Sequence, residues 1–169
     1  RSQDIDTIVK LCYSVFIMTK KIALFGLGPH ARRIYYPYLE KLMTDRDDVS
    51  LELVVDLDIN KEYIEKWLEN RSFQPKHKIY LPADDQINPS EIDDSVTDAL
   101  LKYGINKAIL STEPKAHKVY LKKCIELGIH VVTDKPVTSP VLIGAKTVGS
   151  RQIVDDIDEL LTMLKSHPE

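Results

Sequence analysis

A glycine-rich stretch near the amino end has the GxGxxA spacing that lets backbone N–H groups approach a phosphate, and it reads Gly26, Leu27, Gly28, Pro29, His30 and Ala31. Gly26 would allow a tight turn, and Gly28 would leave no Cβ in the way of a pyrophosphate. Ala31 is small enough for close packing of a helix on the preceding strand. The stretch follows the apolar run 22–26 and opens a helical pattern, so it predicts a dinucleotide-binding turn.

A carboxylate follows the second apolar run and could accept hydrogen bonds from both ribose hydroxyls of an adenosine. Asp56 ends this run, 28 residues after Gly28, and a polar loop accounts for the excess over the usual ~20. Because a carboxylate repels a 2′-phosphate, Asp56 favours NAD. Asp58 is a competing candidate, and Lys61 keeps NADP open. The predicted cofactor is therefore NAD or NADP.

A second polar cluster comes much later, where two more apolar runs end. Ser111 and Thr112 end the first of these runs, and Asp134 ends the second. Lys135 and Pro136 follow at once. An ammonium group is therefore expected at the carboxyl end of a strand, next to Pro136, whose ring fixes the backbone. A surface lysine followed by a simple loop residue is the competing interpretation.

The elements that position these residues follow from the alternation of short apolar runs with helical periodicity. This alternation predicts a single α/β domain with a doubly wound parallel sheet of the Rossmann type. Strands are expected at 22–26, 51–56, 78–81, 107–112 and 129–134, and helices at 29–44, 60–70, 93–103, 114–127 and 151–165. Since both polar clusters follow strands around the switch point of such a sheet, we expect them to face one cleft.

Apolar spacing and helix-end residues refine this scheme. Two helices show a stripe expected to face the core, formed by Ile34, Tyr38 and Leu42 in the first helix and by Val96, Ala99, Leu100 and Tyr103 in the third. Glycine just past a helix end and proline at its first position are common, so the sequence predicts ends at Gly104 and Gly128 and a start at Pro114.

Four ordered segments resemble the glucose-fructose oxidoreductase and inositol dehydrogenase (Gfo/Idh/MocA) family: Ser111-Thr112, Pro114 with His117, Gly128-Ile129-His130-Val131, and Asp134-Lys135-Pro136. The family usually has glutamate where this chain has Asp134, so the charge is kept on a shorter side chain. The resemblance covers residues 20 to about 165. It implies an NAD(P)-dependent oxidoreductase that transfers a hydride to or from the hydroxyl or carbonyl group of a sugar or cyclitol-like substrate.

The resemblance also implies roles for individual residues. The lysine of the family motif lies beside the nicotinamide and the substrate hydroxyl, which makes Lys135 the catalytic candidate. The implied cofactor contacts are Ser111, Thr112, Pro114, His117, Asp134, Lys135 and Pro136, in addition to Asp56 and to residues 26–31, here called the glycine turn. For His117 a role as a helix cap or packing residue competes with cofactor binding.

Composition excludes several classes of partner. A net charge of −3 and a pI near 6.0 leave no basic surplus for nucleic acid or an anionic membrane. Cys12 and Cys124 do not form a CxxC pair, which indicates reduced thiols and a cytoplasmic protein with no metal site. The expected partners are a dinucleotide and a small-molecule substrate, and a homo-oligomer stays open.

The sequence divides into two parts. Residues 1–17 are predicted to be an upstream extension, and residues 18–169 the dinucleotide-binding domain. Family members continue into a second domain that makes most substrate contacts; we expect it to be absent here, so that this chain alone binds dinucleotide without turnover. A stand-alone, non-catalytic NAD(P)-binding or regulatory module is the alternative. Segment 137–150 is expected to be a long loop.

Overall fold

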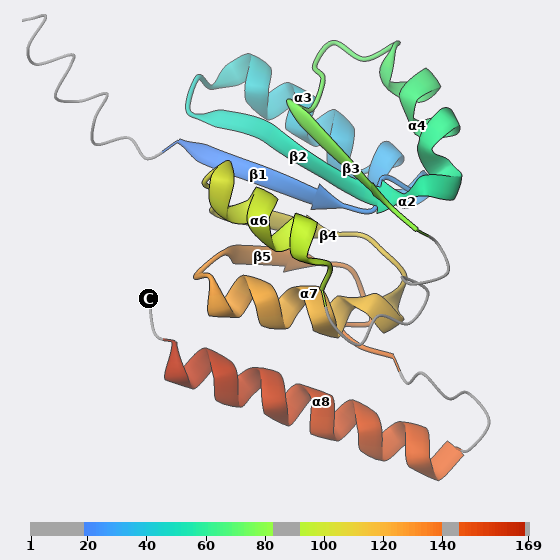
Figure 1. The fold of residues 1–169 in the computed structure, drawn as a ribbon, viewed down its shortest axis with the longest axis vertical. Coiled ribbons are helices and arrows are strands. Elements are labelled where there is room, and N and C mark those ends of the chain that lie inside the picture. Colours follow the sequence, from blue (N-terminus) through green and yellow to red (C-terminus); the bar gives the residue numbers. More distant parts are fainter. Residues whose placement is uncertain (1–18, 83–91, 140–145, 168–169) are drawn as a thin grey trace, which may run out of the picture.

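The computed structural model describes residues 19–82, 92–139 and 146–167. These residues form one parallel sheet in the order β3-β2-β1-β4-β5 (Figure 1). The strands are β1 (Lys20–Phe25), β2 (Val49–Leu57), β3 (His77–Leu81), β4 (Lys107–Leu110) and β5 (His130–Thr133). The strand order reverses between β1 and β4, so the doubly wound Rossmann-type sheet is confirmed and its switch point lies at the end of β1.

Helices cover both faces of the sheet, because the central strands carry apolar side chains on both of their faces. Leu24 packs with the helices that follow β1 and β2, whereas Phe25 packs with those that follow β3 and β4. The first face carries α2 (Pro29–Arg33), α3 (Tyr35–Asp45) and α4 (Lys61–Leu68), and a short 3-10 helix, η1 (Asp58–Asn60), precedes α4. The second face carries α6 (Asp94–Lys102) and α7 (Pro114–Glu126). The two cores are therefore separated by the sheet.

The helix expected at 29–44 is in fact two helices. The helix is interrupted at Ile34, which separates α2 from α3. Pro37 explains the break, since its ring would clash with the carbonyl group four residues earlier, on Arg33, the last residue of α2. In the first turn of a new helix the missing N–H of Pro37 costs little.

This break also corrects the core stripe expected for that helix. Ile34 and Tyr38 are 47% and 62% exposed, whereas Tyr36 and Leu39 are buried. The expected burial was wrong for Ile34 and Tyr38, because the stripe assumed an uninterrupted helical phase across Ile34. The third member, Leu42, is partly buried and packs against the core. In α6 the helix is continuous, and the expected burial of Val96, Ala99 and Leu100 is confirmed, with Tyr103 packed at the edge of the core.

The predicted helix ends agree with the structure. Gly104 and Gly128 follow the last residues of α6 and α7 with φ of 65°, and Pro114 is the first residue of α7. The last helix, α8 (Lys146–Ser166), starts five residues earlier than expected and packs along α7 (Figure 1). Part of the loop expected at 137–150 is thus helical, and residues 140–145, like 1–17, lie outside the described residues.

Within the described ranges, no helix combines the length and apolarity that crossing a bilayer requires.

Candidate functional site

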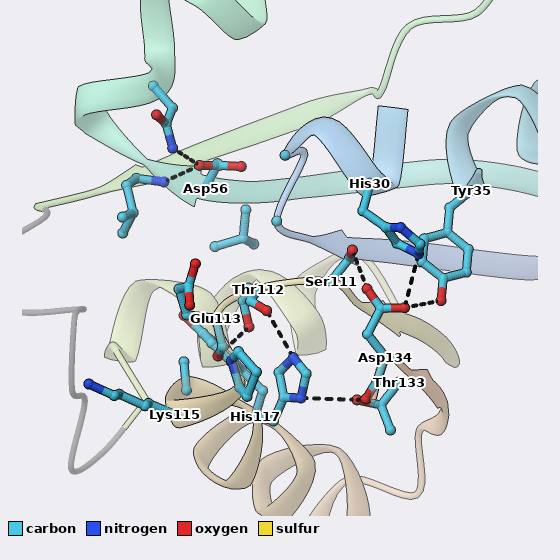
Figure 2. Close-up of a pocket in the computed structure, with 18 of the residues that line it drawn as sticks. His30, Tyr35, Asp56, Ser111, Thr112, Glu113, Lys115, His117, Thr133 and Asp134 are labelled. Carbon is cyan, nitrogen blue, oxygen red and sulfur yellow. Dashed lines mark hydrogen bonds and ion pairs between the residues drawn. The ribbon is translucent and has the colours of Figure 1, made fainter. Parts of the chain in front are cut away.

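A cleft of about 940 Å³ opens at the carboxyl ends of the strands, at the switch point between β1 and β4. It brings together residues that the sequence analysis singled out from both ends of the chain (Figure 2): Gly26, Gly28, Pro29, His30, Asp56, Ser111, Thr112, Pro114, His117, Asp134 and Lys135. The glycine turn and the lysine corner, defined as residues 134–136, therefore border one cleft, as the parallel topology requires.

The two glycines of the turn have different structural roles. Gly26 has φ of 83°, and a Cβ there would lie 2.5 Å from the backbone oxygen of Ser111. Gly28 precedes α2, lines the cleft, and a Cβ on it would meet no atom within 4 Å. Because the space beside Gly28 is open and no side chain caps α2, a pyrophosphate can approach the backbone there. The turn therefore fits a dinucleotide.

The carboxylate of Asp56 is buried and holds the glycine turn in place. Its Oδ2 accepts the Leu27 N–H at 2.6 Å, and its Oδ1 accepts the Leu57 N–H at 2.7 Å and the Asn60 amide at 2.8 Å. A carboxylate has about four acceptor sites. Three are used within the protein, so roughly one is left for a ribose hydroxyl, fewer than the two hydroxyl contacts expected from the sequence.

Asp134 joins the lysine corner to the glycine side of the cleft. Its Oδ2 accepts a hydrogen bond from Ser111 Oγ at 2.6 Å, and its Oδ1 accepts one from the hydroxyl of Tyr35. The ring of His30 lies 3.4 Å from the same Oδ1 and edge-on to Tyr35 (Figure 2). The hydrogen bond to Asp134, followed by burial, raises the pKa of Tyr35 to about 12, so Tyr35 is a neutral donor at physiological pH.

Lys135 lines the cleft next to this cluster but is not part of it. The carboxylate of Asp134 is directed toward Tyr35 and Ser111, and within the described residues Lys135 has no hydrogen-bond or ion-pair partner. None of the described residues thus occupies the ammonium group that borders the cleft. The peptide bond between Lys135 and Pro136 is cis.

His117 connects the two segments that follow β4 and β5. The side chain is fully buried on α7, with Nε2 3.0 Å from the carbonyl oxygen of Thr112 and Nδ1 3.1 Å from that of Pro136. A neutral imidazole has one N–H and can donate to only one of these oxygens at a time. The position supports the interpretation of His117 as a packing residue that also borders the cleft.

Some residues of the sequence analysis lie elsewhere. Leu27 and Ala31 are fully buried behind the turn and do not line the cleft, and the Leu27 N–H is already bonded to Asp56. Pro136 does not line it either, although its carbonyl oxygen contacts His117. Neither Asp58 nor Lys61 lines the cleft, so the structure favours Asp56 over the competing acid.

The cleft also contains residues that the sequence analysis missed, including Tyr35, Asn60, Glu113, Lys115, Tyr120 and Thr133. The assumption of one long helix gave no reason to place Tyr35 near the cleft. Pro37 was the available signal, since a proline at the third position of a helix places Tyr35 at its start, near the cleft. Nothing in the sequence pairs Tyr35 with Asp134.

No three histidine, cysteine, aspartate or glutamate side chains in residues 19–82, 92–139 and 146–167 are arranged to hold a metal ion.

Solved structures with the same fold include several oxidoreductases. One is a scyllo-inositol dehydrogenase from Lactobacillus casei, with 14% identity and a TM-score of 0.54, covering 88% of this chain and 34% of that one. Another is the WlbA dehydrogenase from Chromobacterium violaceum in complex with NADH and UDP-GlcNAcA, with 21% identity and a TM-score of 0.53, covering 89% and 33%. A third is a variant 3-ketoreductase from Actinomadura kijaniata with TDP-benzene and NADP, with 12% identity and a TM-score of 0.53, covering 87% and 34%.

This chain thus spans about a third of the length of the solved structures it resembles. A search of curated proteins gives no match. The family model described as "Oxidoreductase family, NAD-binding Rossmann fold" matches residues 20–150, which include the glycine turn and the lysine corner. The chain therefore belongs to the Gfo/Idh/MocA oxidoreductase family and carries its NAD-binding Rossmann domain.

Proposed function

We propose that this chain is the cofactor-binding half of an NAD(P)-dependent oxidoreductase that acts on a hydroxyl or carbonyl group of a sugar or cyclitol-like small molecule. The observation that carries the proposal is that the glycine turn and Lys135 line the same cleft. Support for the substrate class comes from structural neighbours named as a scyllo-inositol dehydrogenase and as a dehydrogenase in complex with a nucleotide sugar.

The proposed chemistry assigns one proton transfer to Lys135. A bound nicotinamide supplies the acceptor or donor of the hydride. When a carbinol is oxidised, its C–H bond gives up the hydride and its O–H proton passes to the uncharged amine of Lys135, which leaves a carbonyl group. In the reverse direction the ammonium of Lys135 returns that proton. Lys135 suits this role because no acidic side chain in the described residues holds it.

For the cofactor we propose a preference for NAD over NADP. Asp56 lines the cleft and bonds the glycine turn, where the adenosine ribose would lie, and its charge would repel a 2′-phosphate. The structural neighbours include one complex with NADH and one with NADP, so the preference rests on Asp56 alone.

Calorimetric titration of the chain with NAD, NADH and NADP tests the proposal. We expect binding of NAD and NADH, weaker binding of NADP, and no turnover by this chain, since hydride transfer needs a second reactant held at roughly 3–3.5 Å. No binding of any dinucleotide would remove the proposal.

A substitution at Lys135 separates the enzyme from a non-catalytic dinucleotide-binding module. In a longer protein that contains this chain, Lys135→Ala should leave dinucleotide affinity nearly unchanged and lower turnover by roughly 100-fold or more. Lys66→Ala, at an exposed lysine of α4 outside the cleft, is the control. Turnover equal to that of the parent would show that Lys135 has no catalytic role.

A further inference from the structure

A buried acid on the last helix contacts the segment that follows the lysine corner. The Asp156 side chain on α8 is 4% exposed, and its Oδ2 accepts a hydrogen bond from Thr138 Oγ1 at 2.9 Å. Thr138 is equally buried and lies three residues after Lys135. The other carboxylate oxygen of Asp156 lies 2.5 Å from Nζ of Lys118 on α7. One side chain of α8 thus contacts both α7 and the segment that carries the proposed catalytic lysine.

The backbone around Lys135 is held by side chains on both sides. Asp134 is bonded to Tyr35 and Ser111, the carbonyl oxygen of Pro136 faces His117, and Thr138 is bonded to Asp156. Lys135 itself has no partner among the described residues. The arrangement fixes the position of the Lys135 backbone, while no side chain in the described part of the chain holds its ammonium group.

The charges around Asp156 are compensated locally. Burial lowers the pKa of Lys118, but hydrogen bonds to Asp156 and Glu159 raise it by more, so the net shift is upward and Lys118 stays charged. Glu159 also pairs with Lys122 at 2.6 Å. A buried ion pair often gives no more stability than apolar residues of similar size, so docking of α8 on α7 does not by itself require Asp156. The hydrogen bond from the Thr138 hydroxyl group, by contrast, does require Asp156 as its acceptor.

We propose that Asp156 is a positioning residue: by accepting the Thr138 hydrogen bond it couples the docking of α8 on α7 to the placement of Lys135 in the cleft. The role given to Lys135 rests on the proposed function, whereas the coupling itself can be measured without any dinucleotide. The competing explanation is that the network only holds α8 on α7.

The test compares amide hydrogen exchange in the free chain. Thr138→Val removes the hydroxyl at nearly constant size, Thr138→Ser keeps it, and Asp156→Asn removes the charge. Thr162→Val is the matched control, since it removes an exposed α8 hydroxyl that bonds within the helix. We expect exchange in segment 133–138 to rise roughly fivefold or more in Thr138→Val and Asp156→Asn, the factor for one hydrogen bond, and to stay near the parent value in Thr138→Ser and in the control.

Faster exchange in α8 with an unchanged segment 133–138 would overturn the proposal, because the network would then serve docking alone. If Asp156→Asn unfolds, the comparison of Thr138→Val with Thr138→Ser still decides the question.

A second measurement follows the resonance of isotopically methylated Lys135 during titration with NADH. In the parent we expect NADH to shift this resonance. In Thr138→Val the shift should fall by at least half, while NADH affinity stays within about twofold, since most of the cleft is unchanged. An equal shift in parent and variant would contradict the coupling. A parent that binds no NADH, with exchange in segment 133–138 still altered in Thr138→Val, would instead contradict the proposed function.

Discussion

The hydroxyl of Tyr35, at the start of α3, donates a hydrogen bond to the carboxylate of Asp134, 99 residues later at the end of β5. Ser111, which follows β4, bonds the other oxygen of the same carboxylate. These contacts join the glycine side of the cleft to the lysine corner, so Asp134 turns away from Lys135. The acid of the lysine corner therefore contributes to the shape of the cleft, and none of the described residues pairs with the charge of the lysine.

Removing the Tyr35 hydroxyl should weaken this connection. We expect Tyr35→Phe to lower the free energy of unfolding by about 1 kcal/mol, a typical value for one hydrogen bond. Because folding raises the pKa of Tyr35 from 10.0 to about 12, this contribution is complete below pH 10 and is lost as the pH rises toward 12. Chemical denaturation across this range measures it. Tyr38→Phe, at a mostly exposed ring, is the control, and equal stability of the two variants would show that the Asp134 contact contributes nothing.

Alanine at the two glycines of the turn should affect different properties, folding stability at Gly26 and dinucleotide binding at Gly28. Gly26→Ala adds a Cβ at positive φ against the backbone of Ser111, so we expect a loss of about 1–3 kcal/mol or more in folding stability. Gly28→Ala places its methyl group in open space on the cleft wall and should change stability by less than about 1 kcal/mol. It should weaken dinucleotide binding roughly tenfold or more, equal to about 1.4 kcal/mol. Thermal unfolding and calorimetry separate the effects, and undiminished affinity in Gly28→Ala would place the pyrophosphate elsewhere.

Asp56→Asn should affect both the turn and the cofactor preference. An amide has one acceptor oxygen, so at least one of the N–H groups from Leu27, Leu57 and Asn60 loses its partner, at a cost of about 1–3 kcal/mol. The loss of charge should weaken NAD binding and reduce the discrimination against NADP. Titrations with both dinucleotides measure this, with Asp58→Asn as the control outside the cleft. An unchanged ratio of the two affinities would exclude Asp56 as the source of selectivity.

The contact between α7 and α8 should weaken in acid. Hydrogen bonds from Lys118 and Lys122 lower the pKa of Glu159 from 4.5 to about 2. The stabilisation by this carboxylate is therefore present above pH 4.5 and is lost as the pH falls toward 2. The melting temperature of the parent should exceed that of Glu159→Gln at neutral pH, and the two should converge in acid. Glu126→Gln, which alters a pair within α7 alone, is the control; a pH-independent difference would contradict the assignment.

The sequence predicted the parts of the fold that depend on local pattern. Buried runs such as 51–56, the glycine positions at 104 and 128, and the strand-turn-helix context of Gly26 all reflect short-range constraints, and the structure has them. The meeting of the glycine turn and Lys135 in one cleft followed from the parallel topology.

Contacts that depend on side-chain direction could not be predicted in the same way. Asp56 was assigned to a ribose, but its oxygens already accept three hydrogen bonds within the protein. One of them comes from Leu27, because the end of β2 lies against the turn after β1. The bond between Thr138 and Asp156 joins segments whose approach is fixed only by the packing of α8 on α7. Local sequence carries no signal for either contact.

The most direct test of the central claim is a titration of the isotopically nitrogen-labelled chain with NAD, in which the backbone amide resonances are monitored. If one dinucleotide lies across the cleft, the resonances of Gly28 and of Thr112 and Lys135 should shift together, with the same dissociation constant. Shifts confined to one of these two groups, or none in either, would contradict the claim that the glycine turn and the lysine corner bind the same molecule.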